Sequence, residues 1–206
     1  MRYAAGHKAR TRTRLVQEAA QSIRRHGVGG TSIDSVTAAA GLTRGGFYAH
    51  FGSREEMIAA GVAEMVGQSR IIPADGAAAR DPAAALAAYV DFYLSPSHRD
   101  SLTASCALPL LVSEAVRLPA PARTQLAQGA THLSAMLEIQ LRRLGFDDPQ
   151  AEASSVLAEL VGATTLARAE QDLARSEAWL THSRISVRRR LGLAETPAAG
   201  MRTPGA

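Results

Sequence analysis

A short run of residues carries side chains suited to holding a polyanion. Thr43, Arg44, Tyr48 and His50 supply a hydroxyl, a guanidinium, a phenol and an imidazole around the bare backbone of Gly45-Gly46. An arginine can read a guanine edge with two hydrogen bonds, and the other groups can hold phosphates. Two glycines cost a helix about 1 kcal/mol each, which indicates a backbone that must come close to a ligand. These residue types point to DNA recognition.

Two short helices around one tight turn would position this run. Thr31 and Asp34 fit an [ST]-x-x-[DE] capping box, which predicts the start of the first helix. Gly41 is expected to end it, because glycine readily adopts the positive φ found just past a helix end. Thr43 can then cap the second helix.

The second helix is expected to be held from one side. Phe47 and Phe51 are four residues apart and so share one face, which leaves Arg44 and Tyr48 facing away. Ser53 with Glu56 predicts a further capping box and another helix behind it. A plain helical hairpin around a phenylalanine core would use the same pattern, so the residue types alone leave that alternative open.

The segment GLTRGGFYAHFGSRE at residues 41–55 resembles the helix-turn-helix of TetR-type transcriptional regulators. Their pattern reads A-G-[VL]-[ST]-x-G-x-[LF]-Y-x-[HY]-F-x-[ST]-[KR]-[ED], and the match runs without a gap. The resemblance covers about the first 70 residues and extends less specifically to the remainder. It implies a DNA-binding transcriptional regulator that dimerises and usually responds to a small ligand. The charged N-terminus lacks the apolar run of a signal peptide, so we expect the protein to stay in the cytoplasm.

The expected DNA contacts come from this segment and its flanks. The basic start of the first helix could meet the DNA backbone or be a solvated helix end, and Arg54 sits where a helix N-terminus favours phosphate. The full set is Lys8, Arg10, Thr31, Ser32, Thr43, Arg44, Gly45, Gly46, Tyr48, His50 and Arg54.

Charge supports this placement. Residues 1–70 contain ten Lys/Arg and five Asp/Glu, a net charge of +5, whereas residues 71–206 have thirteen and fourteen, a net charge of −1. The basic excess lies where a phosphate-binding surface needs it. The sequence has no apolar run long enough for a membrane span or a signal peptide. Its single cysteine excludes an internal disulfide. We expect no metal, cofactor or catalytic residue.

The fold class expected is all-α, with nine helices in a TetR-like architecture. Apolar periodicity predicts helices at about 8–25, the two of the helix-turn-helix, 54–69, 82–94, 102–116, 122–144, 149–169 and from 176 onward, with 97–100 as a loop. Residues 1–7 read as a flexible arm. The domains expected are 1–70 for DNA binding, 71–193 for ligand binding and dimerisation, and a disordered tail at 194–206.

The resemblance implies an effector site among the middle helices of the second domain. Its expected lining is aromatic and apolar, although each of these residues also suits a plain core. The candidates are Tyr89, Phe92, Tyr93, His98, Cys106, Leu110, Leu133, Met136, Leu137 and Trp179.

Cys106 has the most distinctive chemistry in that region. The segment SCALPLLVSE at residues 105–114 resembles a TetR subgroup with a G-C-[LP]-x-x-x-L-[SG]-x-E segment, some members of which sense electrophiles or oxidants through the cysteine. Ser105 stands where that subgroup has glycine. A thiolate near a helix start, with Arg99 or His98 close by, would be a plausible sensor, and a buried small hydrophobe is the alternative.

The family resemblance also implies a homodimer paired through its last two long helices. A monomeric bundle core is the alternative use of the same apolar residues. The candidates for the interface are Val156, Leu160, Val161, Leu166, Trp179, Leu180 and Val187.

We therefore expect a homodimeric repressor that leaves a palindromic operator in double-stranded DNA when a small effector binds, because paired recognition helices about 34 Å apart read a palindrome. Three rivals stay open: an architectural or activating DNA binder without a ligand, a thiol sensor, and an enzyme that pairs Cys106 with a histidine. The last has no histidine–acid motif behind it.

Overall fold

The computed structural model describes residues 2–69, 71–72, 75–101 and 105–193, and every regular element in them is helical. The all-α expectation is confirmed. Along the chain the elements are α1 (Arg2–Gly30), α2 (Ile33–Ala39), α3 (Arg44–Phe47), α4 (Arg54–Gly67), α5 (Gly76–Arg80), α6 (Pro82–Tyr93), α7 (Pro96–Asp100), α8 (Leu108–Leu111), the 3-10 helix η1 (Val112–Arg117), α9 (Ala120–Arg143), α10 (Pro149–Ala169) and α11 (Leu173–Arg190).

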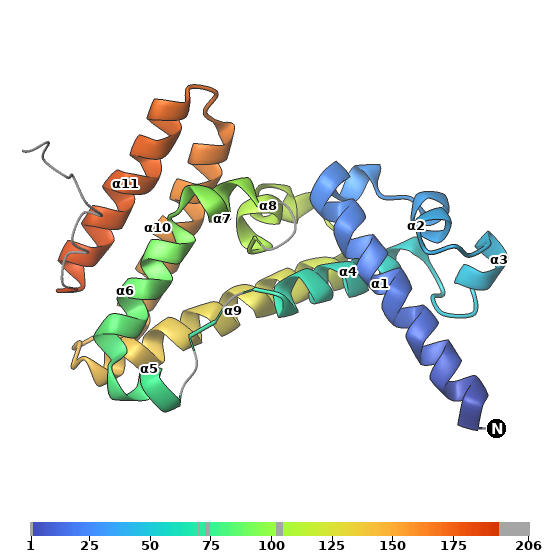
Figure 1. The fold of residues 1–206 in the computed structure, drawn as a ribbon, viewed down its shortest axis with the longest axis horizontal. Helices are drawn as coiled ribbons and strands as arrows, with labels where there is room; N and C mark the ends of the chain where they lie inside the picture. The colour runs from blue at the N-terminus through green and yellow to red at the C-terminus, as the bar shows by residue number, and fades with distance from the viewer. Residues whose placement is uncertain (1, 70, 73–74, 102–104, 194–206) are drawn as a thin grey trace, which may run out of the picture.

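The first helix is longer than its apolar pattern indicated. α1 begins at Arg2, so a flexible arm through residue 7 was wrong, and it continues past residue 25 to Gly30. Its helical path breaks at Gly27, where φ is 70° and ψ is 174°. In Figure 1 the start of α1 extends beyond α2 and α3. The basic residues of α1 are thus carried on a rigid element.

α1 and α4 cross closely within the N-terminal part. Leu15, Ala19 and Ile23 are buried as their spacing predicted. Gly61 of α4 makes the approach possible, because a β-carbon there would lie 2.9 Å from Ile23 Cδ1 and 3.3 Å from the backbone nitrogen of Ala20. This contact sets the base on which α2 and α3 rest.

α4 also packs along α9, and the two helices lie side by side over part of the longer α9 (Figure 1). A β-carbon at Gly129 of α9 would lie only 2.8 Å from both γ-carbons of Val66. One hydrophobic core therefore continues from the N-terminal helices into the rest of the chain. The domain boundary expected at residue 70 falls within a chain whose residues on both sides share this core. The tail expected at 194–206 lies outside the described residues.

The remaining long helices form a bundle in which α10 packs against both α9 and α11, and α6 against α9 and α11. Asp81, Asp148 and Asp172 cap the starts of α6, α10 and α11 by accepting backbone hydrogen bonds. The cap at Asp172 starts α11 earlier than the expected residue 176. No described helix has the length and apolarity needed to cross a membrane.

Two local expectations were wrong. Residues 97–100 belong to the short helix α7, because Ser95 caps it by accepting from His98 N and Pro96 stands in its first turn. The expected helix at 102–116 begins only at Leu108 among the described residues, and it tightens into η1 from Val112.

Candidate functional sites

The turn between α1 and α2 is built around Ser32, which corrects the expected capping box at Thr31 and Asp34. Ser32 Oγ accepts from Ser35 N at 3.0 Å, and Ser32 N donates back to Ser35 Oγ at 3.2 Å. Serine at the third helical position can therefore replace the usual glutamate. Gly41 follows α2 with φ at 65°, as expected.

α3 is a single short turn of helix held by aromatic packing. Thr43 caps it by accepting from Gly46 N at 3.2 Å, as the sequence predicted. Phe47 and Phe51 are fully buried, with ring centroids 5.4 Å apart. A helix this short has little stability of its own, so this anchor determines where its outer face points.

The outer face of α3 carries the recognition groups. Arg44 is 64% exposed at its side chain, and its Nη1 lies 3.5 Å from Asp34 Oδ2. Tyr48 is 53% exposed, with its ring edge-on to Phe47 at 5.2 Å, and Thr43 and Gly45 are also exposed. An ion pair at such exposure contributes little, so Arg44 is free to exchange Asp34 for a ligand.

The basic start of α1 lies beside this face. Burial lowers the pKa of His50, and the nearby charges of Lys8, Arg12 and His7 lower it further. The Arg12 guanidinium sits 4.8 Å above the Phe51 ring. The fold thus brings cations from residues 7–12 next to a side chain some forty residues later. Lys8 and Arg10 are exposed.

Two of the expected DNA contacts are instead used inside the protein. Thr31 is fully buried, and its hydroxyl donates to Gly27 O at 2.9 Å. Arg54 donates Nε to Thr31 O at 2.8 Å and Nη2 to Val28 O. The guanidinium of Arg54 therefore closes the turn between α1 and α2.

Several expected effector residues do gather around His98, which is 2% exposed. Its ring lies 4.5 Å from the Tyr93 ring and 5.1 Å from the Phe92 ring, measured between centroids. Nε2 accepts from Cys106 N at 3.0 Å, so Nδ1 must carry the proton that it donates to Tyr93 O at 2.8 Å. Burial accordingly lowers the pKa of His98 to about 4.

Cys106 precedes α8 and lies outside any helix, contrary to the expected placement. It is 4% exposed, and Ser69 Oγ lies 3.7 Å from its sulfur. The lone pair of His98 is occupied by the backbone N–H of Cys106, so His98 is not placed to deprotonate the thiol. Arg99 forks onto Asp100 and donates to Ser176, so its guanidinium is committed elsewhere.

The cations that do lie near the sulfur were missed by the sequence analysis. The charges of Arg24 on α1 and Arg168 on α10 both interact with Cys106. Arg24 Nη1 donates to Ser105 O at 2.6 Å, and Arg168 Nη2 donates to His98 O at 3.3 Å. They stand 82 residues before and 62 after Cys106, so no local pattern could have joined them.

Other expected effector residues lie in different surroundings. Leu133, Met136 and Leu137 are buried on α9, and Tyr89 is buried on α6, whereas Leu110 is half-buried. Trp179 is 45% exposed on α11, so it does not line an interior site within this chain.

The expected interface residues divide by burial. Val156, Leu160, Leu180 and Val187 are 0–1% exposed inside the chain's own bundle, so they have no surface left for a partner. Val161 is half-buried, and Leu166 and Trp179 are 46% and 45% exposed. Helical periodicity found the apolar residues of α10 and α11 but did not show which of them the chain's own bundle covers.

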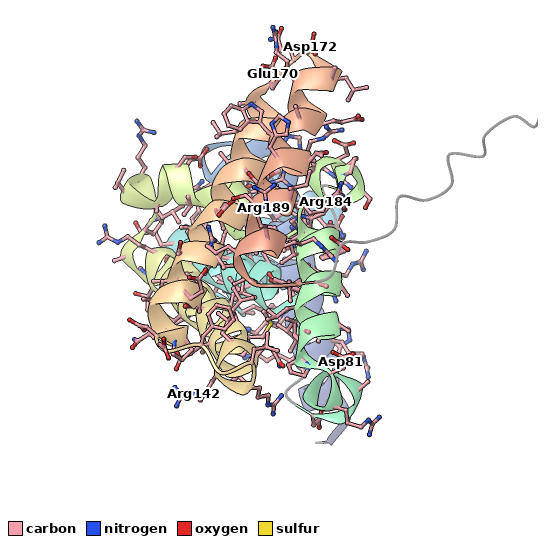
Figure 2. All side chains as sticks on the ribbon, turned by 90° about the vertical axis from the view of Figure 1, so that its left-hand side faces the viewer. Asp81, Arg142, Glu170, Asp172, Arg184 and Arg189 are labelled. Atoms are coloured by element: carbon pink, nitrogen blue, oxygen red, sulfur yellow. The ribbon has the colours of Figure 1, made fainter. Side chains whose placement is uncertain are left out.

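An apolar groove of about 820 Å³ runs along the outer side of α10, between it and α9, with α8 and η1 at one end. Its α10 wall is made of small or aliphatic residues, among them Ala158, Val161, Gly162 and Leu166. Figure 2 looks onto the end of the molecule formed by α10 and α11, with Arg184 and Arg189 on α11 and Glu170 and Asp172 at the turn between the two helices.

Comparison with known families gives one match within this chain. Residues 15–60 match the family model described as bacterial regulatory proteins, tetR family. That segment spans the later part of α1, the whole of α2 and α3, and the first half of α4. No curated protein sequence matches the chain.

Solved structures match over nearly the whole length. The reduced form of NemR from E. coli is 21% identical with a TM-score of 0.75, covering 92% of this chain and 99% of its own. TetR-family regulators from Agrobacterium tumefaciens and Chloroflexus aurantiacus are each 21% identical with a TM-score of 0.69. They cover 87% and 91% of this chain and 98% and 96% of their own. At this identity the likeness establishes the fold.

Proposed function

We propose that this chain, whose residues 15–60 match the tetR family of bacterial regulatory proteins, is a transcriptional regulator of that family and acts as a homodimeric repressor. It binds a palindromic operator in double-stranded DNA through α3 and is released when a small effector binds behind α4. It acts by binding, and we assign it no catalytic step.

The outer face of α3 carries this proposal. Arg44 and Tyr48 project from a turn whose inner face is fixed by two buried phenylalanines, and the basic start of α1 flanks it. Arg44 suits a guanine edge, and the α1 cations suit the adjacent phosphates. A single turn of helix reads few base pairs, so two copies are needed for a specific site.

Selection of bound duplexes from a random pool tests the output. We expect a palindrome whose half-sites are separated by about one helical turn. In competition with unrelated DNA, Arg44→Ala should lose about 1–3 kcal/mol of specific binding and relax one base position. Arg142→Ala, at an exposed arginine near the far end of α9, is the matched control. Equal specific and non-specific affinity for the wild type would refute the proposal.

The groove beside α10 supports the dimer. Its wall of small residues leaves room for a helix, and α11 carries the exposed apolar side chains Leu173, Trp179 and Ile185. Packing α11 of a second copy into the groove of the first would cover both apolar surfaces. A two-fold axis would repeat the same contact between α11 of the first copy and the groove of the second. Such self-complementarity is what a closed dimer requires.

A charge in the groove tests this pairing. Ala158→Glu, on the exposed wall of α10, should convert dimers to monomers in sedimentation and weaken binding to the full palindrome. Ser155→Glu, one position from the groove lining on the same helix, is the control. A monomeric wild type, or an undisturbed dimer in Ala158→Glu, would contradict the proposed interface.

A second input is carried by the surroundings of Cys106. Cys106 is 4% exposed with its sulfur 3.7 Å from Ser69 Oγ, and the neighbouring Ser105 accepts a hydrogen bond from Arg24 on α1 through its carbonyl oxygen. Modification by an electrophile would place a bulky group in a buried position and push on α1 through Ser105. Operator binding after mild alkylation should fall in the wild type and persist in Cys106→Ser. Equal responses of the two proteins would exclude a thiol input.

A further inference from the structure

Arg24 is a buried cation and Arg168 a half-buried one, and the hydrogen bonds of both go to uncharged oxygens. Arg24 is 6% exposed and donates to Ser105 O at 2.6 Å and to Gln68 Oε1 at 3.2 Å. Arg168 donates Nε to Arg99 O at 2.9 Å and Nη2 to His98 O at 3.3 Å. Neither guanidinium forms a salt bridge with a carboxylate in the described part of the chain.

Such an arrangement is electrostatically costly. A guanidinium taken out of water is strongly disfavoured unless a negative charge compensates it. Burial is the main cause that lowers the pKa of both Arg24 and Arg168, and the charge of Arg168 lowers the pKa of Arg24 further. Tyr93, Cys106 and Asp100, in that order, favour the charge of Arg168, but the carboxylate of Asp100 is already forked onto Arg99. No carboxylate among the described residues is hydrogen-bonded to either guanidinium, although Arg24 is buried and Arg168 is half-buried.

Unused hydrogen-bond donors accompany these charges. Arg168 Nη1 and Ser105 Oγ are buried and make no hydrogen bond with any described residue. The Tyr93 hydroxyl lies next to Cys106, and burial, followed by the nearby sulfur, raises its pKa well above the usual value. A deprotonated Tyr93 thus does not supply the missing negative charge. The cluster offers donors and cations, which is the chemistry of an anion site.

We propose that Arg168, Arg24 and Ser105 bind the carboxylate of a small organic acid, which is the effector of the repressor. A planar carboxylate matches the two parallel N–H groups of a guanidinium. The surroundings favour an apolar body on that acid, because Tyr93 and the buried leucines of α9 belong to the core and the Phe92 ring packs against His98. The role of this acid as effector rests on the proposed function, whereas the binding of an anion at these residues does not.

The site is connected to the DNA-binding helices by Arg24 itself. Arg24 lies on α1, and its second hydrogen-bond partner, Gln68, is the C-cap residue of α4. A carboxylate that draws Nη1 away from Ser105 O would loosen the tie between α1 and the segment before α8. Because α1 also carries the cations beside His50, this movement would be felt at the DNA face.

Thermal unfolding of the full-length protein with acetate, octanoate and benzoate tests the anion site, and benzamide serves as the uncharged analogue of benzoate. At least one carboxylate should raise the melting temperature, and benzamide should not. Arg168→Met keeps an unbranched apolar stem but removes the guanidinium, and should weaken carboxylate binding about 10- to 100-fold. Arg142→Met, the same change at an exposed arginine, should leave it unaltered.

Three results would overturn the anion site: no stabilisation by any of the three carboxylates, equal stabilisation by benzamide and benzoate, or equal carboxylate binding by the wild type and Arg168→Met. Stabilisation by phosphate that matches the carboxylates would mean a general anion site and would overturn the organic acid. Titration showing Cys106 ionised at pH 7, with no carboxylate binding, would identify the thiolate as the counter-charge. Operator selection is independent of these measurements, so a failed anion site leaves the DNA-binding proposal standing, and the reverse also holds.

Discussion

Replacing Gly129 by alanine tests the close contact between α9 and Val66 of α4. The new methyl group would sit 2.8 Å from both γ-carbons of Val66 and 3.4 Å from its β-carbon. Valine on a helix is restricted to essentially one χ1 rotamer, and any other would still leave a methyl group near the contact. The clash can be relieved only by moving α4 and α9 apart.

The expected loss of stability follows from two opposing effects. Overfilling a packed contact costs about 1–3 kcal/mol. Replacing glycine within a helix gains about 0.5–1 kcal/mol in backbone entropy. The net destabilisation should be about 1–2 kcal/mol, a fall of roughly 2–8 °C in melting temperature for a chain of this size.

Thermal and urea unfolding should be measured together with operator affinity. Gly67→Ala is the matched control, because it makes the same change on α4 where nothing lies within 4 Å of the new methyl group. Val66→Ala removes both clashing methyl groups. A double-mutant cycle should therefore show a favourable coupling of about 1–3 kcal/mol between Val66→Ala and Gly129→Ala.

The coupling distinguishes the proposed cause from a general loss of helix packing. If Gly129→Ala is as stable as the wild type, or if Val66→Ala does not offset its cost, then the close approach does not limit the spacing of α4 and α9. A stable Gly129→Ala protein with altered operator affinity would also show that the spacing matters for function and not for folding.

Three further outcomes follow from the contacts described. Arg54→Met should cost about 2–3 kcal/mol in urea unfolding, because Thr31 O loses a charged donor, whereas a phosphate contact would leave stability unchanged and reduce the salt dependence of DNA binding. His98 has a folded-state pKa of about 4 against an ordinary 6.5, so stability should be constant above about pH 7 and fall as the pH drops through 6.5 toward 4, with a smaller fall in His98→Gln on calorimetry. Ser53→Ala should destabilise the protein by about 1 kcal/mol through the lost cap at Glu56 N, and full retention of the melting temperature would refute that contribution.

The sequence predicted the helix-turn-helix well because its signals are local. Thr43, Gly41, Phe47 and Phe51 act within a few residues of one another, as a cap, a positive-φ turn and a helix face. Such features do not depend on the remainder of the fold. Even there, the cap moved from Thr31 to Ser32, because Thr31 is drawn inward by Gly27 O and Ser22.

Long-range contacts account for the hydrogen bonds that sequence reasoning did not predict. Arg54 has the right type and place for a phosphate, but two carbonyl oxygens from the end of α1 lie within its reach. Arg24 and Arg168 meet near Cys106 only because α1 and α10 reach the segment before α8 from different sides. No spacing along the chain records such a meeting.

The apolar faces of α10 and α11 show a different limit. Periodicity identifies which residues share a face, but a helix that is apolar on two sides does not reveal which side its own chain covers. Val156 and Leu160 face the bundle, whereas Leu166 faces outward. Residues 160–167 carry no charge, so the sequence does not distinguish the face of α10 that the bundle covers from the face that is exposed.

The position of α4 between α1 and α9 has a consequence for building hybrid regulators. α4 meets α1 at its own Gly61 and meets α9 where Val66 packs against Gly129, so its residues are fitted to two different helices. Joining these first 70 residues to the regulatory half of another relative would pair α4 with a foreign α9. We expect working hybrids to require that the α9 face around Gly129 be transplanted together with α4.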